Sequence, residues 1–169
     1  MRVRPSASKS RVRRSVHARS HREERVALDI LLVADNPGDV RLTEETFQRV
    51  NAGVRLHTAA DGVEAMSFLR REGAYAGVPR PLLILLDLNI PKLDGRAVLR
   101  LIKADEQLKT IPVLVLTLSD APADVRNCYQ AQANCYLKKP ITLEEFQDLI
   151  ASVDRFWLTD ATLMRHPRS

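Results

Sequence analysis

The sequence predicts an α/β protein built on a parallel, five-stranded sheet with helices on both faces, and two observations lead to this prediction. Five short aliphatic runs alternate with stretches whose apolar residues have helical spacing. The third run, residues 82–86, contains no polar residue, which is typical of a strand buried on both faces of a parallel sheet. A chain of 169 residues can bury such a sheet in one domain without disulfides or structural metals.

The elements follow from local signals. The strands are predicted at Leu28–Val33, Val54–Ala59, Leu82–Leu86, Pro112–Thr117 and about Asn134–Leu137. The helices between and after them are predicted over about 39–50, from 62 to near 73, from 95, from 122, and from 143 to 157. Asp39 can cap the first helix, Pro122 lies near the first position of the fourth, and Thr142–Glu145 forms a capping box before the fifth. Right-handed crossovers between such strands leave few topologies.

The charge is divided unevenly along the chain. The formal net charge is +5, but residues 1–25 carry nine Arg or Lys and two acids, whereas the remaining 144 residues carry 17 bases and 19 acids. We therefore expect a disordered basic tail over residues 1–25, one domain over 26–160 and a short stub over 161–169. An inert extension is the favoured interpretation of the tail. An organellar transit peptide and a basic arm that contacts nucleic acid or anionic lipid are the alternatives, and nucleic-acid binding is the least favoured.

The remaining composition indicates a cytoplasmic protein. No apolar run approaches the roughly 20 residues that span a bilayer, and no secretory signal segment follows the tail. Cys128 and Cys135 have no partnering metal-ligand cluster and are expected to be free thiols in a reducing compartment. His57 is expected to point outward from a short strand, and the four histidines lack the spacing of metal ligands.

Four polar residues occur at or just after the ends of predicted strands. Asp35 follows the first strand, Asp87 the third and Lys139 the fifth, while Thr117 ends the fourth. Because the carboxyl ends of parallel strands share one edge of the sheet, these side chains can converge. Two facing acids favour a divalent cation, and oxygen ligands favour Mg²⁺ over zinc. A phosphoryl group on Asp87 would be neutralised by such a metal, a lysine and a hydroxyl.

The segments around these residues resemble a known family. They are Val33–Val40, Leu85–Pro91, Val115–Thr117 and Tyr136–Pro140, and together they are similar to the CheY-like receiver domains of bacterial response regulators. Ala133–Tyr136 and Phe156–Thr159 more narrowly resemble the single-domain regulators that partner bacteriophytochromes and related histidine kinases. The resemblance implies a flavodoxin-like, doubly wound sheet in the order 2-1-3-4-5 with five helices.

The resemblance also implies roles for individual residues. Asp87 would accept a phosphoryl group from a kinase phosphohistidine, and Lys139 would pair with that group. Mg²⁺ would be held by Asp35, Asp87 and the backbone carbonyl of Asn89. The bond between Lys139 and Pro140 would be cis.

The same resemblance implies a switch and a partner. Thr117 and Tyr136 would form the switch pair, in which the hydroxyl moves to the phosphoryl group and the ring turns inward. The face made by the fourth helix, fifth strand and fifth helix would then change its affinity for partners, including a second copy of the chain. The protein would thus be a phosphorelay component and not an enzyme, serving a sensor histidine kinase, with phytochrome-type kinases among the candidates.

Two positions depart from the family pattern and motivate an alternative. Ala34 stands where the family has a second acid, and Leu118 replaces a small residue after the switch threonine. The alternative is a degenerate pseudo-receiver that binds partners without phosphorylation. Asn89 argues against a related class of phosphatase, because an amide cannot serve as the general acid that a carboxylate supplies there.

Overall fold

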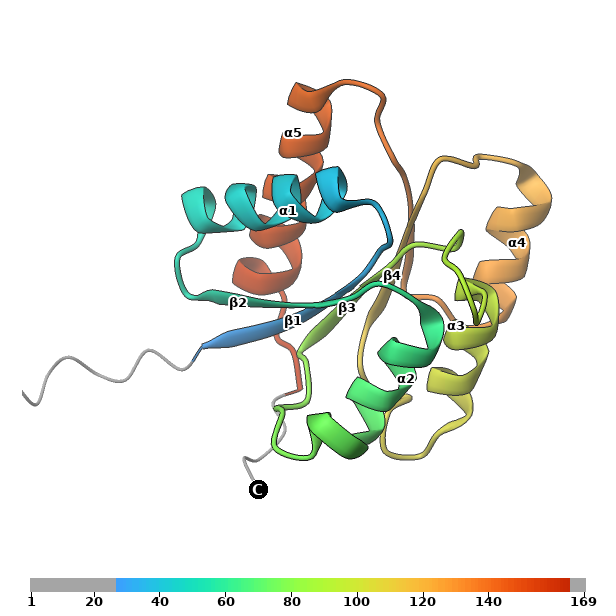
Figure 1. Ribbon diagram of the computed structural model, residues 1–169. Coiled ribbons are helices and arrows are strands. Elements are labelled where there is room, and N and C mark those ends of the chain that lie inside the picture. The colour runs from blue at the N-terminus through green and yellow to red at the C-terminus, as the bar shows by residue number, and fades with distance from the viewer. Residues whose placement is uncertain (1–26, 165–169) are drawn as a thin grey trace, which may run out of the picture.

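The sheet has the predicted topology. The computed structural model describes residues 27–164, and there five parallel strands form one sheet in the order β2-β1-β3-β4-β5 (Figure 1). The strands are β1 Leu28–Val33, β2 Val54–Ala59, β3 Leu83–Leu86, β4 Val113–Thr117 and β5 Cys135–Lys138. The predicted order and strand positions are therefore confirmed to within about one residue at each end. The basic tail and residues 165–169 lie outside the described residues.

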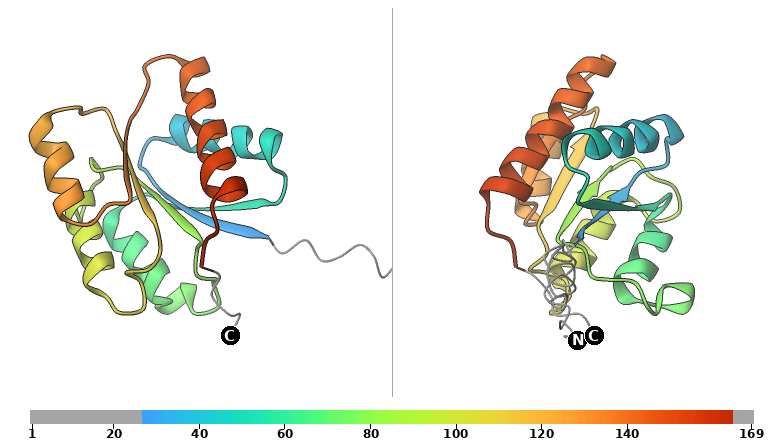
Figure 2. Two further views of the ribbon diagram at one scale, coloured as in Figure 1. Left: turned by 180° about the vertical axis from the view of Figure 1, so that it is seen from behind. Right: turned by 90° about the vertical axis from the view of Figure 1, so that its left-hand side faces the viewer.

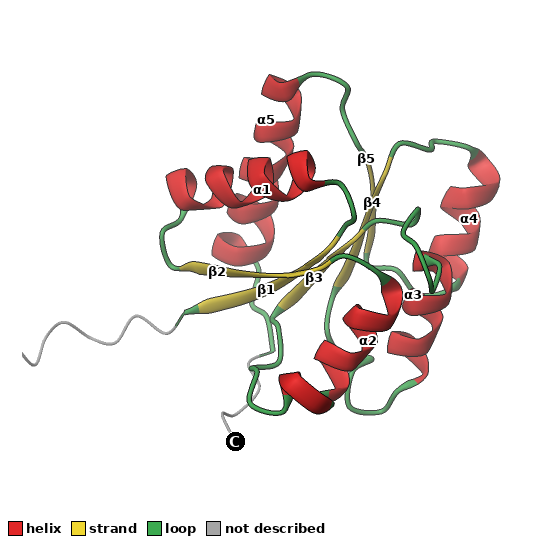
Figure 3. Cartoon of the chain, viewed as in Figure 1, coloured by secondary structure: helices red, strands yellow, loops and turns green. Residues whose placement is uncertain are grey.

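Five α-helices cover the sheet in two layers. They are α1 Pro37–Val50, α2 Gly62–Arg70, α3 Gly95–Ala104, α4 Pro122–Gln130 and α5 Leu143–Val153 (Figure 3). Helices α1 and α5 lie on one face of the sheet and α2, α3 and α4 on the other (Figures 1 and 2). Within residues 27–164, no helix combines the length and apolar composition needed to cross a bilayer.

The alternation of side chains along the strands divides the core in two. Ile30 and Leu32 of β1 pack with Phe47 of α1 and Ile150 of α5. Residues of the opposite parity, such as Leu31, pack against the helices of the other face. All four residues of β3 are buried, because helices cover both faces of this central strand. The prediction from its uninterrupted apolar run is confirmed.

Two helix ends differ from the sequence prediction. Asn36 caps α1, since its side chain accepts from the backbone N–H groups of Gly38 and Asp39, so Asp39 is the third helical residue and not the cap. Helix α2 ends before the predicted Gly73, because Arg71 adopts a left-handed conformation with φ 57° and its backbone N–H bonds back to the helix.

The end of the last helix also differs. The predicted continuous helix to Trp157 is α-helical only as far as Val153 and continues as a π-helix, Asp154–Asp160. The N–H of Ala161 bonds the carbonyl of Phe156 at 2.8 Å, an i to i+5 bond that closes the wider turn. At the start of α5, Thr142 accepts from the N–H of Glu145, which confirms its predicted capping role.

Candidate functional site

Asp87 lies just beyond β3, at the carboxyl edge of the sheet. Its residue is 7% exposed, and its backbone N–H bonds the carbonyl of Val33 at 2.9 Å, which extends the pairing of β1 with β3. The side-chain Oδ1 accepts from the backbone N–H of Asn89 at 3.0 Å. The carboxylate is therefore held in a fixed orientation by the central strand and by the loop that follows it.

The loop after Asp87 depends on the absence of a side chain at Gly95. The N–H of Gly95 bonds the carbonyl of Leu88 at 3.0 Å. A Cβ added at Gly95 would lie 2.4 Å from the carbonyl oxygen of Asp87 and 2.6 Å from the Cα of Leu88. Only glycine allows α3 to begin so close to the end of β3, which fixes the position of the acid.

Lys139 reaches Asp87 from the end of β5. The N–H of Lys139 bonds the carbonyl of Thr117 at 2.7 Å, and its Nζ lies 2.7 Å from Asp87 Oδ2. Burial alone would lower the pKa of Lys139, but hydrogen bonds to Asp39 and Asp87 outweigh burial and hold this pKa above its ordinary value. The ammonium is therefore a permanent positive charge beside the carboxylate.

Asp39 belongs to the same cluster, and sequence reasoning missed it. Its Oδ2 lies 2.8 Å from Lys139 Nζ, and its side chain is 28% exposed. The sequence interpretation assigned it to capping, which Asn36 performs instead. The spacing of four residues after Asp35 could have suggested its role, because the first turn of a helix that follows a strand stays at the same edge of the sheet.

The structure places the predicted metal ligands at this edge. Asp35 is exposed two residues after β1, and Asn89 is exposed two residues after Asp87. Among residues 27–164, no three His, Cys, Asp or Glu side chains form a group that could hold a metal. A metal bound here would therefore need backbone or water oxygens besides Asp35 and Asp87. The donors are all oxygen atoms, and carboxylates outnumber the ammonium, so the chemistry of the set suits Mg²⁺.

The two departures from the family pattern differ in their surroundings. Ala34 is 4% exposed and packs in the core beneath α1 and α5. Because alanine has no ionisable group, this position adds no charge to the edge. Leu118, which follows β4, is 65% exposed. The bond between Lys139 and Pro140 is not cis, contrary to what the resemblance implies, and the trans form is the one that an X–Pro bond intrinsically prefers.

Thr117 and Tyr136 lie on neighbouring strands and both contact Ser119. The Thr117 hydroxyl accepts from the N–H of Ser119 at 3.4 Å, and the Tyr136 hydroxyl donates to the carbonyl of Ser119 at 2.6 Å. The Tyr136 ring packs against the core beneath α2, α3 and α4. In the described residues no hydrogen bond joins Thr117 to Asp87, so the structure brings the hydroxyl to the edge without connecting it to the acid.

The segment that holds Ser119 is tied to α3 and α4. The Ser119 hydroxyl donates to Asp124 Oδ2 at 2.7 Å, and Arg96 Nη2 lies 3.0 Å from Asp124 Oδ1. These two donors lower the pKa of Asp124. A chain of hydrogen bonds therefore runs from Tyr136 on β5 to Arg96 on α3.

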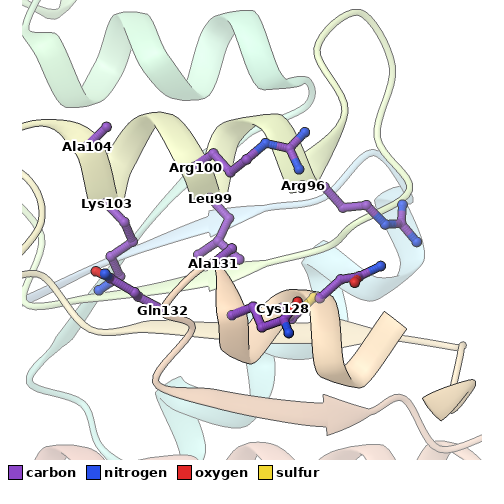
Figure 4. A pocket seen from close by; sticks show the side chains of 10 residues that line it. Arg96, Leu99, Arg100, Lys103, Ala104, Cys128, Ala131 and Gln132 are labelled. Atoms are coloured by element: carbon purple, nitrogen blue, oxygen red, sulfur yellow. The ribbon is translucent and has the colours of Figure 1, made fainter. Parts of the chain in front are cut away.

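A separate hollow of about 640 Å³ lies between α3 and α4 (Figure 4). Arg96, Arg100 and Lys103 contribute its positive charges. Arg96 is already paired with Asp124, and Lys103 Nζ donates to Asn134 Oδ1 at 2.9 Å. No residue that lines this hollow belongs to the Asp87 cluster, so the candidate site is the carboxyl edge.

The fold and this edge define the class of protein. A sequence profile of the response regulator receiver domain matches residues 30–151, and the chain belongs to that family. It is 45% identical over 134 residues to response regulator Rcp1 of Synechocystis sp., and this alignment covers 79% of this chain and 91% of Rcp1. The predicted resemblance and fold class are thereby confirmed.

Solved structures extend the comparison. The phosphorylated cyanobacterial phytochrome response regulator RcpA aligns with a TM-score of 0.79 at 44% identity, over 81% of this chain and 98% of RcpA. The Mn²⁺-bound form of Rcp1 aligns with a TM-score of 0.77 at 44% identity, over 80% of this chain and 98% of Rcp1. The receiver domain of the Pseudomonas aeruginosa kinase PA1611, with magnesium in its active-site cleft, has a TM-score of 0.61 at 32% identity, over 78% and 98% of the two chains.

Proposed function

We propose that this chain is a single-domain response regulator that accepts a phosphoryl group on Asp87 from the phosphohistidine of a sensor kinase. The observation that carries the proposal is the buried pair at the carboxyl edge, in which Lys139 Nζ lies 2.7 Å from Asp87 Oδ2. Support comes from membership of the receiver family and from the relative RcpA, whose solved structure is phosphorylated.

The chain's own residues account for the transfer. A carboxylate oxygen of Asp87 attacks phosphorus, and the phosphorus–nitrogen bond breaks with its electron pair remaining on the kinase imidazole. The product is an acyl phosphate on Asp87. Lys139 balances the charge of the phosphoryl oxygens, and the Thr117 hydroxyl donates to one of them after rotating from Ser119.

The cation of this proposal is Mg²⁺. Asp35, Asp87 and the backbone carbonyl of Asn89 would hold it. When bound, it would neutralise negative charge that develops on the transferring group. The Mn²⁺-bound form of Rcp1 and the magnesium-bound receiver of PA1611 support this assignment.

The output belongs to the same proposal. Movement of Thr117 and Tyr136 would alter the face made by α4, β5 and α5, where Tyr129 and Leu143 expose 50% and 64% of their surface. The proposed partners are a second copy of this chain and a sensor kinase, and the similarity to the cyanobacterial phytochrome response regulator RcpA favours a phytochrome-type kinase. The protein would act as a signalling module in the cytoplasm, which is consistent with the free thiols of Cys128 and Cys135.

Phosphoryl transfer from a small donor tests the proposal. Purified protein with Mg²⁺ and acetyl phosphate should gain one phosphoryl group in intact-mass spectrometry, and Asp87→Asn should abolish the gain because an amide is not a nucleophile for phosphorus. Asp154→Asn is the matched control, since Asp154 is 8% exposed and accepts from Asn51 Nδ2 far from this edge.

The outcomes separate the two functions. Labelling that requires Asp87 but not Asp154 supports the phosphoacceptor. If the wild type is not labelled, and Asp87→Asn binds the partner as tightly as the wild type does, the chain is instead a pseudo-receiver.

A further inference from the structure

Asp39 occupies an unusual position for the first turn of a helix. Asn36 already satisfies the N–H groups at the start of α1, including that of Asp39 itself at 3.3 Å. The side chain of Asp39 therefore has no capping task. It points across to Lys139, 100 residues further along the chain, and meets its ammonium at 2.8 Å.

The charge balance of the edge gives this contact a consequence. Without Asp39, two carboxylates, Asp35 and Asp87, would lie with one ammonium at the edge. Ala34, where the family resemblance implies another acid, is buried in the core and uncharged. Asp39 restores a third carboxylate to the edge, from α1 instead of from the end of β1.

The geometry of Lys139 shows what Asp39 does besides adding charge. An ammonium has three donors, of which one reaches Asp87 and another reaches Asp39. With two carboxylates holding it from β3 and α1, the ammonium has one donor left. A phosphoryl oxygen on Asp87 can take that donor while Asp39 keeps the lysine in place.

We propose that Asp39 is a positioning residue that anchors Lys139 between α1 and β3 and supplies the negative charge that Ala34 does not. The inference rests on the proposed phosphoacceptor role of Asp87, and it assigns to α1 a part in both cation binding and phosphoryl transfer. The contact lies at the start of α1, so the anchor also ties this helix to the end of β5.

Metal titration tests whether the negative charge of Asp39 contributes to Mg²⁺ binding. Isothermal titration calorimetry with Mg²⁺ alone should show about a three- to tenfold weaker affinity for Asp39→Asn, the effect of removing one unit charge several ångströms away in a partly solvated site. Glu44→Gln is the matched control, since Glu44 is an exposed acid on the same helix, and it should leave the affinity unchanged. Equal affinities for Asp39→Asn and the wild type would overturn the inference.

A conservative variant separates charge from folding. Asp39→Glu keeps the carboxylate and should retain the wild-type Mg²⁺ affinity within about twofold, because the charge stays near Lys139. A loss as large as that of Asp39→Asn would overturn the charge role.

The rate of labelling by acetyl phosphate tests whether Asp39 positions Lys139 for phosphoryl transfer. Asp39→Asn should be labelled more slowly at saturating Mg²⁺, where metal binding no longer limits the rate, and an unchanged rate would overturn the anchoring role. The two proposals fail separately: an unlabelled wild type removes the function of Asp87, while the calorimetric comparison still decides the charge role of Asp39.

Discussion

Two buried carboxylates lie at opposite ends of the sheet, and their surroundings differ in one respect. Asp29, at the amino end of β1, and Asp87, beyond β3, are each 7% exposed. Arg55 Nε lies 2.8 Å and His57 Nε2 2.9 Å from the same oxygen of Asp29. At the amino edge, one acid therefore meets two bases, both from the neighbouring strand β2.

At the carboxyl edge the balance is reversed. Lys139 bonds both Asp87 and Asp39, and Asp35 lies at the same edge, so carboxylates exceed the ammonium. Burial and short contacts are common to both clusters and do not distinguish them. The two clusters differ in the charge that remains after pairing, because of the two only the carboxyl-edge cluster has an excess of carboxylates that could bind a cation.

The largest effect should come from the amino-edge cluster around Asp29. Asp29→Asn should lower the free energy of unfolding by about 1–2 kcal/mol, because a charge-assisted acceptor for Arg55 and His57 is lost while Arg55 regains some solvation. Urea unfolding measures this change. Asp148→Asn, an exposed acid on α5, should stay within about 0.5 kcal/mol of the wild type. No loss for Asp29→Asn would show that the amino-edge cluster does not stabilise the fold.

A smaller effect of opposite sign should follow at the carboxyl edge. Asp35→Asn should raise the free energy of unfolding by about 0.5 kcal/mol in EDTA, because it relieves repulsion among partly solvated carboxylates. The same variant should lose the stabilisation that Mg²⁺ gives the wild type, since a ligand stabilises only the state that binds it. Urea unfolding with and without Mg²⁺ measures both changes, and destabilisation in EDTA would contradict an excess of negative charge.

The smallest effect belongs to a surface cluster in which Ser119 and Arg96 hold Asp124. Their hydrogen bonds lower the pKa of Asp124 below the ordinary value of 3.8. A carboxyl group with a lowered folded-state pKa stabilises the fold above its unfolded pKa and loses that contribution as the pH falls through the folded pKa. Asp124→Asn should therefore slightly flatten the dependence of the urea midpoint on pH below about pH 4. An unchanged dependence would show that solvent fully screens the half-buried pair of Arg96 and Asp124.

The fold was predictable because its signals are local and repeated. The uninterrupted aliphatic run before Asp87 indicates a strand covered on both faces, and turn residues separate it from helices with regular apolar spacing. The cap of α1 was predicted wrongly because Asn36 and Asp39 are both capping residue types. Only backbone geometry decides that Asn36 precedes the first helical turn.

The sequence predicted only those site residues that lie at or directly after the ends of strands. Asp87 and Lys139 follow strands of one parallel sheet, so their meeting could be inferred from topology. Asp39 follows no strand directly, and its contact depends on the direction in which α1 leaves β1. His57 was expected to point outward, but its side chain is only 19% exposed because it bonds Asp29 and packs on Phe68.

The π-helix at the end of α5 changes which aromatic residue the surface presents. Its wider turn has the effect of one residue inserted into an α-helix. Trp157 and Leu158 pack against the core, while Phe156 is 57% exposed. A relative with one residue fewer between Val153 and Ala161 would regain α-helical winding and rotate a different side chain outward. Chain length in this segment, as much as amino-acid composition, therefore determines the aromatic ring that a binding partner would meet.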